Sequence, residues 1–391
     1  MLKKSIALVG IVGIQMAVVL VTAEIILRSY FPITTYYMVD RGGLAEYVGW
    51  SPIVANDGGA HPIFLCDNDH KAIPSPSVGR ILLVGDSLLD CNETGSMPFE
   101  NTIPYLLQKQ LGKAWDVYNL SAGGWGTDQE YLAYKLQGEA IKPQTVVLFF
   151  TPGNDLYNNS SASAIGGVVE KPHFELIDGK LVLVPMSKKS DSSHRIRSVY
   201  ASLELYKRVK VLSEKMQHLA ERVETLLASD ERVEFLNSER YHQIAPSVWP
   251  IPSRYQRSWE VTEQILSDMN AEVKKSGAEF VIFVLPTGIP NMCDATPMYP
   301  KRCIGYEAES INLMCAGRKV VVRPFQQGKK IKDFGEKYGI VVLDAYSALG
   351  QYNYKWDEIS KDCLHFTDRR GVELVATILA DYLLGDVSRV R

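Results

Sequence analysis

Residues 81–89 read ILLVGDSLL, an apolar run that stops abruptly at Gly-Asp-Ser. A short aliphatic run bounded by turn-forming residues is typical of a strand that is buried on both faces of a parallel sheet. Further runs of this kind occur along the chain. The predicted strands are Ile81–Val84, Val117–Leu120, Val146–Phe150, Phe280–Leu285 and Ile340–Leu343.

Helical patterns lie between most of these runs and after the last one. Strands that alternate with helices indicate a doubly wound α/β fold, in which helices cover both faces of a parallel sheet. The predicted helices are Ile103–Leu111, Gln129–Leu136, Trp259–Lys275, Ile331–Lys337 and Gly371–Leu384.

The third and fourth predicted strands are too far apart for a simple crossover, which predicts an insertion at about residues 156–255. Within it, two apolar runs around Asp178-Gly179-Lys180 predict a β-hairpin over His173–Pro185. Apolar residues spaced alternately by four and three predict a long helix over residues 200–228, with about three heptad repeats. This helix either packs along its own domain or contacts a partner or a second copy of the chain.

The N-terminus carries Lys3 and Lys4, followed by an apolar segment from Ile6 to Leu27. That length suffices for a membrane-spanning helix, and the preceding basic residues favour a cytoplasmic N-terminus. The remainder of the chain would then lie outside the cytoplasm. Two alternatives stay open: a signal peptide cleaved after Val21-Thr22-Ala23, and a buried core helix.

Charge and cysteine usage narrow the class of protein. The net charge is −3, without a dense cluster of Lys or Arg, which disfavours a nucleic-acid partner. Six cysteines allow disulfides in an exported protein, and Cys293 and Cys303 form the easiest local pair; alternatively, most are small buried hydrophobes. No pair has Cys-x-x-Cys spacing, so we expect no structural zinc site, and the sequence implies no cofactor.

Residues suited to catalysis follow the first and last predicted strands. Ser87 comes directly after the first, and Asp362-Cys363-Leu364-His365 comes after the last. The carboxyl ends of parallel strands are where such sheets place their active sites. An Asp three residues before a His can hold the imidazole Nδ1–H and fix the tautomer that a general base needs. Each motif by itself is also an ordinary turn.

Two further segments follow the second and third predicted strands. Asn119–Thr127 contains Gly123 and Gly124, whose backbone N–H groups can approach a bound carbonyl closely. Gly153-Asn154-Asp155 offers the Asn154 amide as a donor to the same oxygen. Together the segments supply a nucleophile, two oxyanion donors and an oriented base, which is the set that acyl transfer requires.

These segments resemble the conserved blocks of the SGNH hydrolases (GDSL-like esterases and lipases), named for Ser, Gly, Asn and His. The resemblance implies that Ser87 is the nucleophile and that its own N–H lies in the oxyanion hole. Gly124 and Asn154 would be the other oxyanion donors, with Gly123 as the alternative register. Asp362 would orient the general base His365.

The same resemblance implies a flavodoxin-like three-layer α/β/α sandwich with a five-stranded parallel sheet. The hydrolase domain would span residues 80–386, after an N-terminal anchor or uncleaved signal at 1–28 and a lead-in at 29–79. Two positions depart from the family pattern. Leu88-Leu89 stands where an aromatic and a small residue are usual, and Cys363 is unexpected within the last motif. A classical α/β-hydrolase is disfavoured, because the second Gly of a nucleophile elbow is missing.

The layout also resembles bacterial membrane-anchored members of this superfamily, some of which add or remove acetyl groups on cell-surface polysaccharides. It implies a serine esterase that acts outside the cytoplasm on an O-acyl ester of a carbohydrate or cell-surface polymer. An O-acetyltransferase would share the acyl-enzyme and differ only in the acceptor. A catalytically silent carbohydrate- or partner-binding module is the third hypothesis.

Overall fold

The structure is a computed structural model. From residue 79 onward, the residues that it describes belong to one compact unit. The described residues are 19, 22–23, 79–89, 99–159, 161–162, 171–185, 236, 244–285, 289–290, 303–304, 309–315, 318–345, 356–360 and 363–385.

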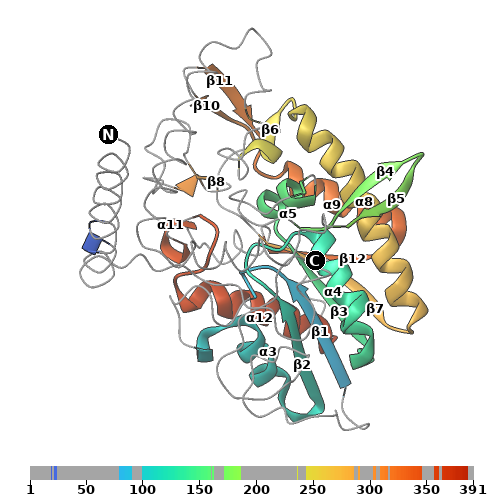
Figure 1. Ribbon diagram of the computed structural model, residues 1–391. Coiled ribbons are helices and arrows are strands. Elements are labelled where there is room, and N and C mark those ends of the chain that lie inside the picture. The colour runs from blue at the N-terminus through green and yellow to red at the C-terminus, as the bar shows by residue number, and fades with distance from the viewer. Residues whose placement is uncertain are drawn as a thin grey trace, which may run out of the picture. The chain divides into compact units, whose positions relative to one another are not determined.

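A five-stranded parallel sheet forms the centre of this unit (Figure 1). Its strands lie in the order β12-β7-β3-β1-β2, and every pair of neighbours is parallel. Counted along the chain, this is the 2-1-3-4-5 order of flavodoxin-like folds, so the predicted architecture is confirmed. The strands are β1 (Gly79–Gly85), β2 (Trp115–Ser121), β3 (Thr145–Phe150), β7 (Glu279–Val284) and β12 (Val341–Asp344).

Helices cover both faces of the sheet because alternate strand residues point to opposite sides and both sets are apolar. On one face, Ile81 and Leu83 join a cluster with α3 (Ile103–Leu111) and α12 (Arg369–Leu383), which lie side by side in Figure 1. On the other face, Leu82 and Val84 join a second cluster. That cluster includes residues of α4 (Thr127–Leu136), α5 (Pro152–Asn159), α8 (Ser253–Lys275) and α9 (Gln326–Tyr338).

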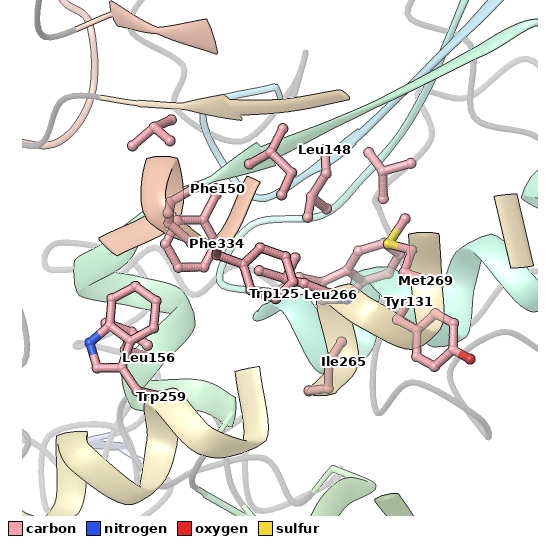
Figure 2. Packing of buried hydrophobic residues seen from close by; sticks show 14 of the residues in the cluster. Trp125, Tyr131, Leu148, Phe150, Leu156, Trp259, Ile265, Leu266, Met269 and Phe334 are labelled. Carbon is pink, nitrogen blue, oxygen red and sulfur yellow. The ribbon is translucent and has the colours of Figure 1, made fainter. Parts of the chain in front are cut away.

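The second cluster contains the bulkiest side chains of the core. Figure 2 shows Trp125 among Leu148 of β3 and Leu266 of α8. Trp125 is fully buried and directly follows the glycines after β2. Its indole therefore fixes that turn to the core, at the edge of the sheet where the predicted site residues gather.

The insertion begins as predicted, with a hairpin of β4 (His173–Ile177) and β5 (Lys180–Val184). Asp178 and Gly179 form its two-residue turn with φ values of 51° and 72°. Positive φ at both turn positions suits the right-handed twist of the flanking strands, and Asp-Gly is a favoured pair there.

Several short strands between residues 248 and 322 were not predicted. β6 (Val248–Trp249), β10 (Ile311–Cys315) and β11 (Arg318–Val322) form an antiparallel sheet, and β8 (Ile289–Pro290) pairs with β9 (Cys303–Ile304). β10 and β11 alternate between buried and more exposed residues, so they lack the continuous apolar runs that marked the central strands. The remaining short helices are η1 (Phe99–Asn101), η2 (Gly112–Ala114), η3 (Gly138–Ile141), η6 (Ala245–Ser247) and α11 (Trp356–Ile359).

Three predicted segments lie largely or wholly outside the described residues. They are the apolar N-terminal segment, the lead-in at 29–79 and the heptad helix at 200–228. Of the first, Val19, Thr22 and Ala23 are described and are helical. Within the described part of the chain, no helix combines the length and hydropathy that a membrane span requires. The N-terminal anchor and the heptad contact therefore stay predictions.

Candidate active site

The turn after β1 is built around Asp86. The Asp86 carboxylate accepts a hydrogen bond from the Leu88 N–H at 3.0 Å, and its backbone oxygen accepts one from the Leu89 N–H at 3.1 Å. A side chain that bonds to the backbone two residues ahead is a common way for Asp to fix a tight turn. Asp86 is fully buried, so it anchors this turn in the core. The turn holds the partly exposed Ser87 at the carboxyl end of β1.

Ser87 meets His365 in this structure. Ser87 Oγ and His365 Nε2 are 2.8 Å apart, although the two residues are separated by 278 positions in the sequence. That distance is within the range for direct proton transfer from a hydroxyl to an imidazole. The sequence-based pairing of these two residues is thus realised in space.

His365 lies in a short loop between α11 and α12. An isolated antiparallel bridge joins Ser360 to Phe366, and the Thr367 N–H donates to the Ile359 carbonyl at 2.8 Å. Asp362, the predicted orienting carboxylate, lies outside the described residues, and its role stays a prediction.

Gly124 occupies the turn after β2 in a left-handed conformation, with φ of 73°. Gly123 lies in the same turn but does not have a positive φ. Glycine adopts the left-handed conformation without the steric cost that a Cβ brings, so the geometry favours Gly at 124. Among the described residues, no acceptor is bonded to the N–H groups of Ser87 or Gly124. Both N–H groups are therefore available to an oxyanion.

Asn154 lies in the first turn of α5, shortly after the end of β3. Its Nδ2 donates to Asp86 Oδ2 and to the Trp125 carbonyl, each at 2.8 Å. An amide nitrogen carries two hydrogens, so both are engaged. In this state Asn154 joins the turns after β1, β2 and β3. Its predicted donation to an oxyanion would require one of these bonds to be exchanged for the substrate.

Asn158 is a site residue that the sequence analysis missed. Its Nδ2 donates to the Gly124 carbonyl at 2.8 Å and to Asn154 Oδ1 at 3.2 Å. Asn154 and Asn158 are four residues apart and share one face of α5, as spacing on a helix dictates. A pair of asparagines at this spacing after a buried strand is the signal that was available in the sequence. Asn158 supports both predicted oxyanion donors at once.

Below these turns lies a set of fully buried carboxyl groups: Asp86, Asp128, Glu130 and Asp155. Burial raises the pKa of Glu130 and Asp155 well above its usual range, and the neighbouring carboxylates raise it further. Neither Glu130 oxygen has a hydrogen-bond partner among the described residues. The physical consequence is that Glu130 and Asp155 favour their neutral forms.

Lys171 is a buried cation that contacts one of these four carboxyl groups. It is fully buried and forms a hydrogen-bonded ion pair with Asp128 at the start of α4. Burial lowers the pKa of Lys171, and the Asp128 carboxylate opposes that shift. Within the described part of the chain, no group of three or more His, Cys, Asp or Glu side chains is arranged to hold a metal ion.

Asp86 links this buried set to the Ser87–His365 pair. Burial raises the pKa of Asp86, whereas hydrogen bonds from the Leu88 N–H and the Asn154 amide, and the charge of His365, oppose the shift. The attraction is mutual, so a negative Asp86 also stabilises a protonated His365.

Comparisons with known proteins find similar solved structures, all at low sequence identity. No protein-family model and no curated protein sequence matches the chain. A solved α/β hydrolase, LAE5, from the metagenome of Lake Arreo, Spain, is 11% identical, with 78% of this chain and 96% of that one covered and a TM-score of 0.39. The lipase/acylhydrolase of Enterococcus faecalis is 13% identical, with 79% and 97% covered and a TM-score of 0.39. An acetyl xylan esterase, AlAXEase, is 12% identical, with 79% and 99% covered and a TM-score of 0.35.

Proposed function

We propose that this protein is a serine esterase in which Ser87 attacks the carbonyl carbon of an ester. The contact between Ser87 Oγ and His365 Nε2 at 2.8 Å carries the proposal. The pair lies at the carboxyl edge of the sheet, beside the point where the strand order reverses between β1 and β3. Open α/β sheets bind their ligands in the crevice at such a point.

In each half of the reaction, His365 takes one proton and then gives it up. As Ser87 Oγ bonds to the carbonyl carbon, Nε2 takes the hydroxyl proton and then gives it to the departing alcohol. The N–H groups of Ser87 and Gly124 stabilise the negative oxygen, and Asp86 stabilises the imidazolium. Water then attacks the acyl carbon while Nε2 accepts its proton. As the bond between that carbon and Ser87 Oγ breaks, Nε2 gives the proton to Oγ, which releases the acid and restores Ser87.

The direct test is Ser87→Ala, assayed on p-nitrophenyl acetate and by labelling with a fluorophosphonate. We expect hydrolysis to fall by about 10⁴-fold or more and labelling to be lost, because the nucleophile is gone. Ser310→Ala, at an exposed serine, is the matched control and should keep both. Unchanged turnover in Ser87→Ala would overturn the proposal.

We further propose that the enzyme acts outside the cytoplasm on an O-acyl ester of a carbohydrate or cell-surface polymer. The support is the basic and apolar N-terminal segment, the resemblance described above, and the disulfide bonds of Cys315 and Cys363. Structural disulfides persist mainly in oxidising compartments. An alkaline phosphatase fused after residue 391 reports the compartment, since it is active only outside the cytoplasm.

Hydrolase and acetyltransferase differ in what receives the acyl group from Ser87. Incubation with an acetylated oligosaccharide, followed by mass spectrometry, separates them: a hydrolase releases acetate, and a transferase yields a newly acetylated acceptor glycan. A protein that is neither labelled at Ser87 nor active on either substrate would favour the silent binding module instead.

A further inference from the structure

The loop that carries His365 contains a cysteine that the proposed reaction does not use. Cys363 is two residues before His365, is fully buried, and is disulfide-bonded. It also has a φ of 64°, a left-handed conformation that side-chain-bearing residues rarely adopt. Such a conformation persists only where the surrounding structure holds it in place.

The two sides of His365 are held by different means. On the C-terminal side the constraints are noncovalent: Phe366 bridges to Ser360, and its ring packs so closely on α12 that Gly371 has no room for a Cβ. The Asp368 carboxylate caps α12 by accepting from the Arg370 N–H. On the N-terminal side, only Leu364 stands between His365 and the covalently tethered Cys363.

Cys363 also belongs to the hydrophobic cluster on the face of the sheet covered by α3 and α12, together with Ile359 and Phe366. The Cys363 end of the disulfide thus lies in the packed interior. A fixed point two residues from His365 restricts where the imidazole can lie relative to Ser87. Proton transfer needs that geometry, and a misplacement of about 1 Å can cost about 10²-fold in rate.

We propose that Cys363, through its disulfide, is a positioning residue for His365, so that reduction of this bond slows the reaction without unfolding the protein. The proposal rests on the esterase function above. In the chemical step, a dithiol reductant breaks the S–S bond: two protein thiols form, and the dithiol closes to a cyclic disulfide as the two electrons are transferred. Reoxidation by a disulfide oxidant such as oxidised glutathione reverses the change.

The test compares oxidised and dithiothreitol-treated full-length protein. Initial rates on p-nitrophenyl acetate, fluorophosphonate labelling of Ser87 and the far-ultraviolet circular dichroism are measured on the same samples. We expect kcat to fall by about 10²-fold with KM changed less than about twofold, since binding groups are untouched. Circular dichroism should be unchanged, and oxidised glutathione should restore the rate.

Cys363→Ser is the corresponding variant, and Cys315→Ser is its matched control. Cys315 is equally buried and disulfide-bonded, but it ends β10 and belongs to the other hydrophobic cluster. Cys363→Ser should show the low kcat in the oxidised state and lose its response to dithiothreitol, whereas Cys315→Ser should keep both the high kcat and the response. If Cys363→Ser does not fold, the reversible reduction of Cys315→Ser decides, with alkylation and peptide mapping to show that Cys363 is among the thiols released.

The outcomes separate this inference from the proposed function. Oxidised protein that is labelled and active, and that stays so after Cys363 is reduced, overturns the positioning role and leaves the esterase intact. Equal losses in Cys363→Ser and Cys315→Ser would show a general effect of disulfides on stability and would also overturn it. Oxidised protein that is neither labelled nor active overturns the proposed function, and the inference with it.

Discussion

At the scale of single residues, the sequence predicted which side chains meet at the site better than it predicted their hydrogen-bond partners. Ser87 and His365 could be paired from sequence because a Ser after the first strand and an Asp-x-x-His before the last helix fit one chemistry. The partners of Asn154 could not be predicted, since they are set by the depth at which Asp86 and Trp125 are buried. The sequence identified the Asn154 side chain as a hydrogen-bond donor, but its acceptors depend on how the three turns pack together.

Gly124→Ala should impair the proposed oxyanion hole. A Cβ at φ of 73° strains the backbone by about 1–2 kcal/mol, and relaxation of φ turns the N–H away. We expect kcat to fall by about 10²-fold on p-nitrophenyl acetate. Gly277→Ala is the control, because it has a φ of 81° and nothing within 4 Å of an added Cβ. It should lose similar stability and keep its kcat; equal rates in the two variants would contradict the role of Gly124.

Glu130→Gln should make stability less dependent on pH. Burial raises the pKa of Glu130 in the folded protein above its unfolded value, so the folded state binds more protons as pH rises from about 4. The contribution of Glu130 to the free energy of unfolding is therefore present at low pH and is lost as pH rises towards the pKa of the folded state. The amide does not titrate, so urea unfolding at pH 5 and pH 8 should differ less in the variant. If the difference between pH 5 and pH 8 is the same in the variant as in the wild-type protein, Glu130 does not contribute to the pH dependence of stability.

At the scale of elements, five strands and five helices were predicted close to their observed positions because each is a continuous apolar run or a clear amphipathic pattern. Helix α3 was predicted with the bounds it has, Ile103–Leu111. Helix α5 was missed as a helix, because Pro152–Asn159 is rich in turn-forming and amide residues. Buried contacts, not helix propensity, hold it: Ser258 of α8 donates to the Leu156 carbonyl, and Asn159 donates to Thr262.

Lys171→Met should destabilise the junction between α4 and the start of the insertion. Removal of the ammonium leaves the Asp128 carboxylate buried without its counter-charge, which typically costs about 3–5 kcal/mol. Adding Asp128→Asn should recover part of this loss, since the remaining group is neutral. Urea denaturation of both single variants and the double variant measures the coupling. Strictly additive losses would show that the two side chains do not interact.

At the scale of the whole molecule, the parallel sheet brings Ser87 and His365 together at the carboxyl ends of its strands. The sequence predicted this arrangement, because the strands are continuous apolar runs. The minor sheet of β6, β10 and β11 could not be predicted, because its short strands alternate in burial and receive their pairing from distant segments: Val322 pairs with Val248. The buried carboxyl set was equally unpredictable. Asp128 and Glu130 look like exposed residues in the first turn of a helix until the hairpin and α5 cover them.

The pairing of Ser87 with His365 also has a consequence in time. The two residues are 278 positions apart, so a growing chain carries Ser87, the proposed nucleophile, long before His365, the proposed general base, has been made. Until the last helix docks beside α3, the hydroxyl remains an ordinary alcohol. The proposed activity therefore begins only after His365 has been made and α12 has docked, and a chain truncated before His365 carries no activated serine.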